Sequence, residues 1–478
     1  MSGKLVTGLM KWDGSMTRLV KRTLILGFTF FSLVLISSCG KKQLEITQTK
    51  MEKAGSYNLT EKKGYSNEGV KETVEQSYIS PDGLCIINKM QSYYDVTLDY
   101  SKGNAEQVGR AYASVILKSI SDYENVMEPY LFENIRISLG SMGRDYDSLL
   151  PRMEALYESL SYEYKAEVKG FAEEISKGEH GFIENGSISY EEGILMQMVP
   201  DALRGTACSA LSLWGEKTLS GKNIMCRNLE WNLGSEEQMS HYHAVVHMSK
   251  GNKSITNITV LGLIGILTAV NNEGVFAAIL DVGSNGENFE YENKKCYTYE
   301  LRKALEVYTN AIDVGNFMVD NSSTFTFSHN IALSDNNGSY CAEDAVESLQ
   351  KSGKGYSVLR AASTPIFEGL HWETKDAFFV LNSFASINNQ DTFSVGESNI
   401  VRCAKFNSWL KSKGKFNLAD VKEMLTQEKV DQDKVVAIHS KNVFHTVIID
   451  YETGIIQAAF SSPEGKQDKS EFISIGHY

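Results

Sequence analysis

The sequence lacks several features that mark large classes of protein. Its seven cysteines include no C-x-x-C pair, which argues against a zinc knuckle and against a dense disulfide framework. Basic residues are outnumbered, with 47 Lys and Arg against 60 Asp and Glu for a net charge of −13. A nucleic-acid partner would need a basic face, so nucleic-acid binding is not expected. The 478 residues show no internal repeat, and 42% hydrophobic with 22% charged residues is typical of a globular protein with a sizeable core.

The sequence also lacks an apolar run long enough to span a membrane, which takes about 20 residues. The run at 23–36 is shorter, follows Lys21 and Arg22, and leads into Ser-Ser-Cys39-Gly. A basic flank, a short apolar segment and small residues before a cysteine are typical of a secretory signal, whereas a short buried helix would leave these flanks unexplained. The last residues resemble a bacterial lipoprotein box, which implies a lipid on Cys39. We therefore expect an exported lipoprotein of the cell envelope, held to the membrane through Cys39.

The pattern around Cys208 predicts a β-hairpin. Apolar and small polar residues alternate after Cys208, a turn with glycine follows at 219–223, and a second apolar stretch runs to Arg227. A cysteine at the start of one strand would then lie near Arg227 and Glu230 at the end of its partner. Free cysteine is among the most buried residue types, so a structural cysteine beside an ion pair is the alternative.

The segment 208–231, which ends in Arg-Asn-Leu-Glu-Trp, resembles the nucleophile hairpin of the acyl-coenzyme A:6-aminopenicillanic acid acyltransferase family. These proteins are N-terminal-nucleophile hydrolases related to the choloylglycine hydrolases and acid ceramidase. The family pattern has Arg-Asn-x-Asp at this place, so Glu230 departs from it by one methylene. The resemblance implies that the chain is cut between Ala207 and Cys208 and that Cys208 becomes the N-terminal nucleophile.

Two later asparagines match positions that supply oxyanion-hole amides in the family. Residues 261–280 predict two apolar strands about an Asn-Asn-Glu-Gly turn, and Asn271 matches the first family asparagine. Ala269 and Val270 stand where the family usually has Gly and Met. Asn382 matches the second asparagine, near the end of a predicted strand at 378–384.

A further segment, 398–410, resembles the "SxxxR" helix start of the family. The resemblance implies that Arg402 lies at the active site. The alternative is a surface arginine on a helix capped by Ser398, a residue type that caps well.

Hydrophobic periodicity predicts a mixture of helices and strands. Helices are expected at 104–123, 145–177, 190–203 and 299–318, strands at 84–100 and 330–338, and a hairpin of two strands at 443–460 around the turn at 452–454. The resemblance, over about residues 85–460, implies an α+β fold: an αββα sandwich of two stacked antiparallel sheets flanked by helices, with a mostly helical N-terminal pro-segment. The expected division is a lipoprotein signal peptide at 1–39, a polar tether at 40–78, a helical pro-segment or α-chain at 79–207 and a catalytic β-chain at 208–478.

The sequence contains one cluster of histidines, His241, His243 and His247. On a strand these side chains would share a face, which is compatible with metal binding. No carboxylate or thiol is predictably adjacent, so we expect no metal, and the resemblance implies no cofactor.

The chemistry implied by the resemblance is acyl transfer. A cysteine thiol of pKa near 8.5 is only a few per cent ionised at neutral pH and needs a base. The α-amino group that cleavage would free on Cys208 has an ordinary pKa of about 7.7 to 8.0 and can accept the thiol proton. Arg227 would favour the thiolate, Glu230 would orient the amine, and Arg402 would complete the charge arrangement.

The predicted function is thus an autoproteolytic cysteine amidohydrolase or acyltransferase that cleaves a small, linear N-acyl amide through a thioester. One alternative is a papain-like Cys–His hydrolase using His329, His439 or His445, although the residues after Cys208 lack that family's aromatic signature. The other is a non-catalytic surface lipoprotein that binds a small ligand. The sequence leaves open the acyl group, the amine and the oligomeric state.

Overall fold

The computed structural model describes residues 62–478, apart from 142–145, 204–207, 284–290, 368–369, 371, 373, 391–396, 428–437 and 466–468. Cys39, the signal segment and Ala207 lie outside the described residues, so lipidation and cleavage stay predictions. Within the described ranges, no helix is both long and apolar enough to cross a membrane.

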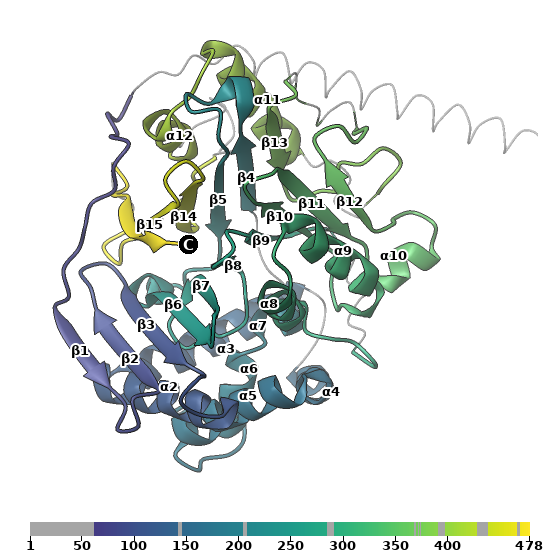
Figure 1. The fold of residues 1–478 in the computed structure, drawn as a ribbon. Coiled ribbons are helices and arrows are strands. Elements are labelled where there is room, and N and C mark those ends of the chain that lie inside the picture. The colour runs from purple at the N-terminus through teal and green to yellow at the C-terminus, as the bar shows by residue number, and fades with distance from the viewer. Residues whose placement is uncertain are drawn as a thin grey trace, which may run out of the picture. The chain divides into compact units, whose positions relative to one another are not determined.

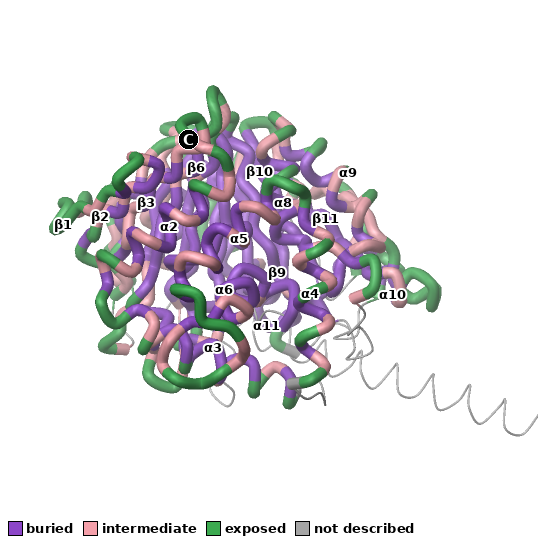
Figure 2. Tube along the Cα trace, turned by 90° about the horizontal axis from the view of Figure 1, so that it is seen from below, coloured by how far each residue is buried: buried purple, intermediate pink, exposed green. Residues whose placement is uncertain are grey.

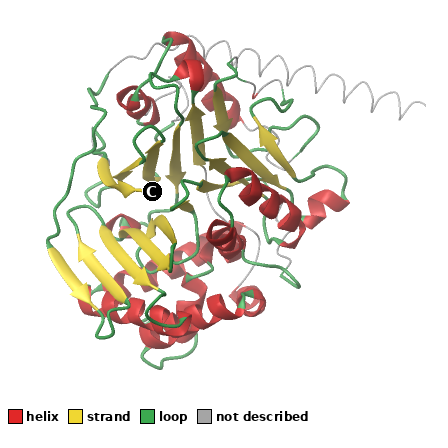
Figure 3. Ribbon diagram, in the orientation of Figure 1, coloured by secondary structure: helices red, strands yellow, loops and turns green. Residues whose placement is uncertain are grey.

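Two β-sheets form the centre of the described chain, and helices lie against them (Figures 1 and 3). The larger sheet has the strand order β1-β2-β3-β6-β7-β8-β9-β10-β11-β12, and the smaller has the order β13-β4-β5-β14-β15-β16. The strands of the larger sheet are β1 Gln76–Ile79, β2 Cys85–Lys89, β3 Tyr94–Asp99, β6 His243–Lys250, β7 Lys253–Val260, β8 Thr268–Asn271, β9 Phe276–Asp281, β10 His329–Ser334, β11 Ser339–Asp344 and β12 Val358–Ala361. Those of the smaller sheet are β13 Ala377–Val380, β4 Cys208–Leu213, β5 Ile224–Glu230, β14 Val443–Asp450, β15 Ile455–Phe460 and β16 Ile473–His477.

The helices fall into two groups along the chain. Those before Cys208 are α2 Ala105–Ser119, α3 Tyr123–Ser141, α4 Leu149–Ser159, α5 Tyr162–Ser176, α6 Tyr190–Met196 and α7 Val199–Leu203. Those after it are α8 Tyr297–Val307, α9 Ala311–Asn321, α10 Glu347–Lys351, α11 Glu397–Ser412 and α12 Leu418–Leu425. Short 3-10 turns occupy η1 Tyr146–Ser148, η2 Gly215–Lys217, η3 Gln238–His241 and η4 Ser322–Thr324. Helices α2, α8 and α9 contact the larger sheet, and α12 contacts the smaller sheet at β5.

Several predicted elements are divided in the structure. The helix expected at 145–177 is η1, α4 and α5, and the helix expected at 190–203 is α6 and α7. The strand expected at 84–100 is the hairpin of β2 and β3, because the chain turns back between Lys89 and Tyr94. The helix expected at 299–318 is α8 followed by α9, because Asn310 is extended and its side chain accepts a hydrogen bond from the Asp313 amide. An asparagine cap of this kind starts a new helix.

Close packing of α2 on α5 depends on two glycines. A Cβ on Gly109 would collide with the Glu167 carbonyl, and a Cβ on Gly170 would collide with the Glu106 carbonyl. Hydrogen atoms in place of side chains therefore let the two backbones touch. Buried residues run from these helices through the larger sheet (Figure 2), so this part of the chain shares one core with the sheets.

The portion before Cys208 also contributes strands. Strand β3 pairs with β6 over six residues, from Tyr94 opposite Ala244 to Asp99 opposite Ser249, and the two strands are parallel. The expectation of purely antiparallel sheets is corrected at this pair. Because β3 precedes Cys208 and β6 follows it, the two portions of the chain are joined within one sheet.

Candidate active site

Cys208 is the first residue of β4, in the smaller sheet. Its side chain is buried, with 2% of the residue exposed. In the ladder between β4 and β5, Cys208 lies opposite Leu229 and Ala210 lies opposite Arg227. Residues two apart on a strand share a face, and diagonal neighbours are within reach of a long side chain. The predicted hairpin therefore places Cys208 and Arg227 on the same face.

The contact between these two side chains is direct. Nη2 of Arg227 donates to Sγ of Cys208 at 3.1 Å and to the Ile279 carbonyl at 2.8 Å. Burial raises the pKa of the Cys208 thiol above its ordinary value, while Arg227 and the backbone amide of Glu230 act to lower it. A thiol in this setting is protonated at neutral pH, so a nucleophile here needs a base.

A second arginine holds the backbone of Cys208. Nη1 of Arg402 donates to the Cys208 carbonyl at 2.5 Å, and Nη2 donates to Oδ1 of Asn382 at 3.0 Å. The same Asn382 oxygen accepts from the Cys208 amide at 2.7 Å. Arg402 is buried within α11, so the alternative of a surface arginine is wrong, and Ser398 lies inside the helix rather than before it.

The orientation of Asn382 changes the role expected for it. Its oxygen faces two donors, Cys208 and Arg402, while Nδ2 donates to the Asp281 carbonyl at 2.7 Å. Because an amide oxygen accepts and its nitrogen donates, the structure points the acceptor end of Asn382 at the nitrogen of Cys208. The predicted oxyanion donor is thus, in this arrangement, a holder of the Cys208 nitrogen.

Glu230 ends β5 on the side of Arg402. Burial raises the pKa of its carboxyl, and the opposite charge of Arg402 and a hydrogen bond with Ser440 act to lower it. Residues alternate between the faces of a strand, so Glu230 and Arg227 leave β5 on opposite sides. Arg227 therefore contacts the Cys208 sulfur on one face of the smaller sheet, and Glu230 points toward Arg402 on the other face.

The structure does not bring Asn271 to this group. Nδ2 of Asn271 donates to the carbonyls of Leu305, at 3.0 Å, and Tyr308, at 3.1 Å. Its Oδ1 accepts from the amides of Glu273, at 3.1 Å, and Val275, at 2.9 Å. Both amide hydrogens are thus used, and Asn271 stabilises a turn with Gly274 at positive φ. The oxyanion role expected for Asn271 is therefore wrong, and the plain turn signal in the sequence was the better guide.

The three clustered histidines do not act together. His241 ends η3 and is not on a strand. His243 hydrogen-bonds Ser461, and His247 contacts Thr256 and Asp95. Among the residues that the structure describes, no group of three or more His, Cys, Asp or Glu side chains is placed to hold a metal ion.

An apolar cavity of about 50 Å³ has a residue of strand β5 in its wall. Leu229, which lies opposite Cys208 in the ladder, is in its wall, as is Leu267, whose carbonyl accepts from Arg227. The other lining residues come from both portions of the chain: Met127, Tyr130, Leu131, Met196, Val199, Pro200, Trp231, Met239, Val260, Leu261, Gly262, Leu263 and Phe444. Methionine side chains adapt to irregular shapes, so this wall can adjust to a ligand.

Comparison with solved structures finds distant likenesses, at low sequence identity and with TM-scores below 0.5. The Caenorhabditis elegans ortholog of N-acylethanolamine-hydrolyzing acid amidase is 10% identical, covers 51% of this chain and 92% of its own, and has a TM-score of 0.36. A variant of the conjugated bile acid hydrolase from Clostridium perfringens is 13% identical, and the match covers 56% of this chain and 92% of the hydrolase, with a TM-score of 0.33. Penicillin V acylase from Agrobacterium tumefaciens is 10% identical, and the match covers 53% of this chain and 83% of the acylase, with a TM-score of 0.30. No protein-family model and no curated protein sequence matches the chain.

Two residues that the sequence did not single out belong to the group around Cys208. Oδ1 of Asn399 accepts from the Arg402 guanidinium, at 2.6 Å, and from the backbone N–H of Asn382, at 3.3 Å. Asn399 precedes Arg402 by three residues on α11, and helical spacing could have found it. Thr268, which hydrogen-bonds Arg227, gives no such local signal, because β8 and β5 lie in different sheets.

Proposed function

We propose that the chain is a cysteine amidohydrolase or acyltransferase that cuts its own Ala207–Cys208 bond and then cleaves linear N-acyl amides through a thioester. One observation carries this proposal. The sulfur, the nitrogen and the carbonyl oxygen of Cys208 are each held by a separate buried polar side chain: Arg227, Asn382 and Arg402. A structural cysteine needs none of these contacts, because buried thiols pack as small apolar groups.

The proposed maturation uses the same atoms as the later reaction. The Cys208 thiol attacks the Ala207 carbonyl carbon, the acyl group shifts from nitrogen to sulfur, and water hydrolyses the thioester. Cys208 then carries a free amine. Its ordinary pKa of about 7.7 to 8.0 makes it a base near neutral pH, which supplies what the raised thiol pKa requires.

In the proposed reaction the amine takes the thiol proton as sulfur attacks the substrate carbonyl. The substrate C–N bond then breaks, its nitrogen leaves with a proton from the Cys208 amine, and water or an amine removes the acyl group from sulfur. Arg227 stabilises the thiolate, and Asn382 holds the new amine through its oxygen. Arg402 and Glu230 balance charge on the other side of the strand.

Asn382 is also the candidate donor to the oxyanion, through Nδ2. In the structure this nitrogen donates to the Asp281 carbonyl, while the oxygen of the same side chain accepts from the Cys208 amide. A donor aimed at a developing oxyanion contributes about 3 to 4 kcal/mol of transition-state stabilisation.

The proposed substrate has an apolar acyl part. The cavity that begins at Leu229 and Leu267 has a wall of apolar and aromatic residues, and apolar walls bind hydrocarbon rather than charge. Leu229 lies opposite Cys208 in the ladder, so an acyl chain on the sulfur would run toward this cavity, and the methionine side chains in its wall would have to move to enlarge a volume of about 50 Å³. The amine half of the substrate is not specified by these contacts.

We further propose that the protein is an exported lipoprotein of the cell envelope, held to the membrane by a lipid on Cys39. The support is the basic flank, short apolar run and small residues before Cys39. Metabolic labelling with a radioactive fatty acid tests this: wild type should carry label, and Cys39→Ala should not. Label on the Cys39→Ala protein, or none on wild type, would contradict the proposal.

The test of activity is a panel of N-acyl amides, conjugated bile acids, ceramides and penicillins, each with acyl chains of several lengths. Purified wild type should release amine from apolar members and form an acyl adduct of matching mass on the fragment that begins at Cys208. Cys208→Ala should do neither. The proposal would be contradicted if Cys208→Ala hydrolysed an amide of the panel. It would also be contradicted if wild type, cleaved between Ala207 and Cys208, hydrolysed no amide of the panel and formed no adduct.

Two other functions predict different results. In a papain-like hydrolase an imidazole would serve the sulfur, but His445 contacts Thr268 and His329 pairs with Asp344. Loss of adduct formation in His329→Ala or His439→Ala would favour that mechanism. Binding of panel members without turnover would favour the non-catalytic lipoprotein, since Glu230 and Ala269 depart from the resembled family pattern.

A further inference from the structure

Arg227 is held in place by the larger sheet, not by its own. Its Nη1 donates to the Leu267 carbonyl at 3.3 Å and to the hydroxyl of Thr268, and its Nη2 donates to the Ile279 carbonyl at 2.8 Å. All of these acceptors lie at β8 or β9 or just before β8. The guanidinium therefore bridges the two sheets, and its position against Cys208 depends on the start of β8.

The Thr268 hydroxyl is itself fixed by His445. A guanidinium only donates, so the Thr268 oxygen must accept from Arg227, and its own proton is free for another acceptor. Nε2 of His445 lies 3.0 Å from that oxygen. When the Thr268 hydroxyl donates to Nε2, His445 carries its own proton on Nδ1. Burial, Arg227 and His243 all lower the pKa of His445, which agrees with a neutral ring.

This arrangement is not explained by stability. Nδ1 of His445 is buried and has no hydrogen-bond partner among the described residues. A buried ring nitrogen without a partner is destabilising, which offsets what the Thr268 contact contributes. What the pair does supply is an oriented acceptor for the buried Arg227 guanidinium, through the Thr268 hydroxyl.

We propose that Thr268 and His445 are positioning residues that hold the Arg227 guanidinium on the sulfur of Cys208. The inference rests on the proposed function, in which Arg227 stabilises the thiolate. His445 acts only as an acceptor in this chain of contacts, from Cys208 through Arg227 and Thr268, and takes no proton from the sulfur.

The test measures the rate of alkylation of Cys208 by iodoacetamide from pH 5 to 10, quantified on the Cys208 peptide by mass spectrometry. Thr268→Val removes the hydroxyl at constant shape, and Thr268→Ser keeps it. Thr259→Val is the matched control, since Thr259 is equally buried in β7 and its hydroxyl has no partner among the described residues. His445→Phe removes the acceptor, and His445→Gln restores one.

Thr268→Val should raise the alkylation midpoint by about one pH unit, which is a tenfold lower rate below the midpoint. His445→Phe should shift it in the same direction by less, and His445→Gln, Thr268→Ser and Thr259→Val should stay near wild type. The double variant Thr268→Val/His445→Phe removes the His445 ring nitrogens as well, and Arg227 keeps the Leu267 and Ile279 carbonyls as acceptors, so this variant keeps the test available should a single variant unfold.

An unchanged midpoint in folded Thr268→Val and in the double variant would overturn the inference. So would an equal shift in Thr259→Val, or a wild-type Cys208 that reacts at no pH. Amide hydrolysis separates the two proposals. If the midpoint shifts in Thr268→Val but wild type hydrolyses no amide, the proposed function is wrong and the positioning role stands. If wild type hydrolyses amides but the midpoint does not shift in Thr268→Val, the positioning role is wrong and the proposed function stands.

Discussion

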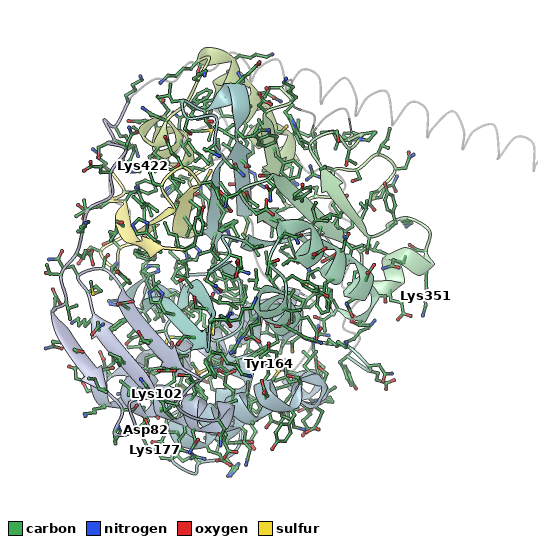
Figure 4. The ribbon with its side chains drawn as sticks, in the orientation of Figure 1. Asp82, Lys102, Tyr164, Lys177, Lys351 and Lys422 are labelled. Carbon is green, nitrogen blue, oxygen red and sulfur yellow. The ribbon has the colours of Figure 1, made fainter. Side chains whose placement is uncertain are left out.

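Nη1 of Arg302 lies 2.6 Å from Oε2 of Glu167, and the two side chains are 3% and 0% exposed. The pair joins α8 to α5, on opposite sides of Cys208 in the chain. The rings of Tyr100 and Tyr164 lie 5.3 and 4.8 Å from the guanidinium (Tyr164 is labelled in Figure 4). A buried charge pair is strongly destabilising to break, because the remaining partner is left unpaired.

The two pieces of a cut chain should therefore stay together. In native buffer we expect both fragments to elute as one species in gel filtration and to separate only in denaturant, because β3 and β6 also share a sheet. Glu167→Ala should lower the free energy of unfolding by about 3 to 5 kcal/mol. Glu163→Ala is the control, since Glu163 pairs with Lys250 at the surface. Fragments that separate without denaturant would contradict this prediction.

Cleavage should depend on Cys208 alone among the cysteines of this hairpin. Intact-mass analysis should find a fragment of residues 208–478 in wild type and in Cys226→Ala, and only the uncut chain in Cys208→Ala. Cys226 is the matched control because it is buried on β5, with Sγ directed at the Leu211 carbonyl. A cut Cys208→Ala chain would remove Cys208 from the maturation step.

Asn271 and Asn382 should fail in different ways. Asn271→Ala breaks four hydrogen bonds of a turn and a helix end, so we expect a loss of about 2 to 3 kcal/mol in unfolding free energy. Its activity per folded molecule should stay near wild type. Asn382→Ala should lower activity by about 10²-fold or more. Comparable losses of activity in folded samples of both variants would show that Asn271 contributes to catalysis.

Asp201 should make the protein less stable as the pH rises. Its carboxyl accepts from the Thr298 hydroxyl at 2.6 Å, but burial raises its pKa to about 7. An unfolded aspartate has a pKa of about 3.9, so from about pH 4 to about 7 the folded state keeps a proton that the unfolded chain has lost. The stabilisation is complete below about pH 4 and is lost as the pH rises through 7, on the order of 4 kcal/mol at most.

Denaturant unfolding at pH 5, 6, 7 and 8 measures this slope. Asp201→Asn should flatten it, because the amide does not ionise, and Asp82→Asn, which removes an exposed carboxylate (labelled in Figure 4), should keep the wild-type slope. Equal slopes in wild type and Asp201→Asn would show that Asp201 is ionised throughout.

The local parts of the fold could be predicted from the sequence because their signals are local. Alternation after Cys208 and the turn at 219–223 predict the β4–β5 hairpin, and pleating then places Arg227 on the face of Cys208. Helix α2 was predicted from Asn104 onward, and Asn104 caps it with Gln107 in a capping box. The predicted helix at 299–318 is too long, because Asn310 caps a second helix within a periodic apolar pattern.

Matching to a family motif is least reliable for asparagine, because its side chain can either stabilise a turn or contact an active-site group. An asparagine before a glycine turn satisfies backbone amides by itself, so Asn271 matched a motif by spacing while its side chain was already used. Asn382 matched by the same kind of spacing and does contact Cys208, but with its oxygen. Which end of an amide faces a neighbour depends on the surrounding donors, and here those are Arg402 and the Cys208 nitrogen.

By itself the sequence determined the hairpin of Cys208, Arg227 and Glu230, the start of helix α2 at its Asn104 cap, and the acidic, cysteine-poor character of the chain. These follow from contacts between residues close in sequence and from composition. Only the tertiary structure decided that Asn271 stands apart, that Asn399, Thr268 and His445 surround the site, and that β3 pairs in parallel with β6. Each of these contacts joins residues far apart in the chain, and their partners are selected by the packing of two sheets rather than by any local pattern.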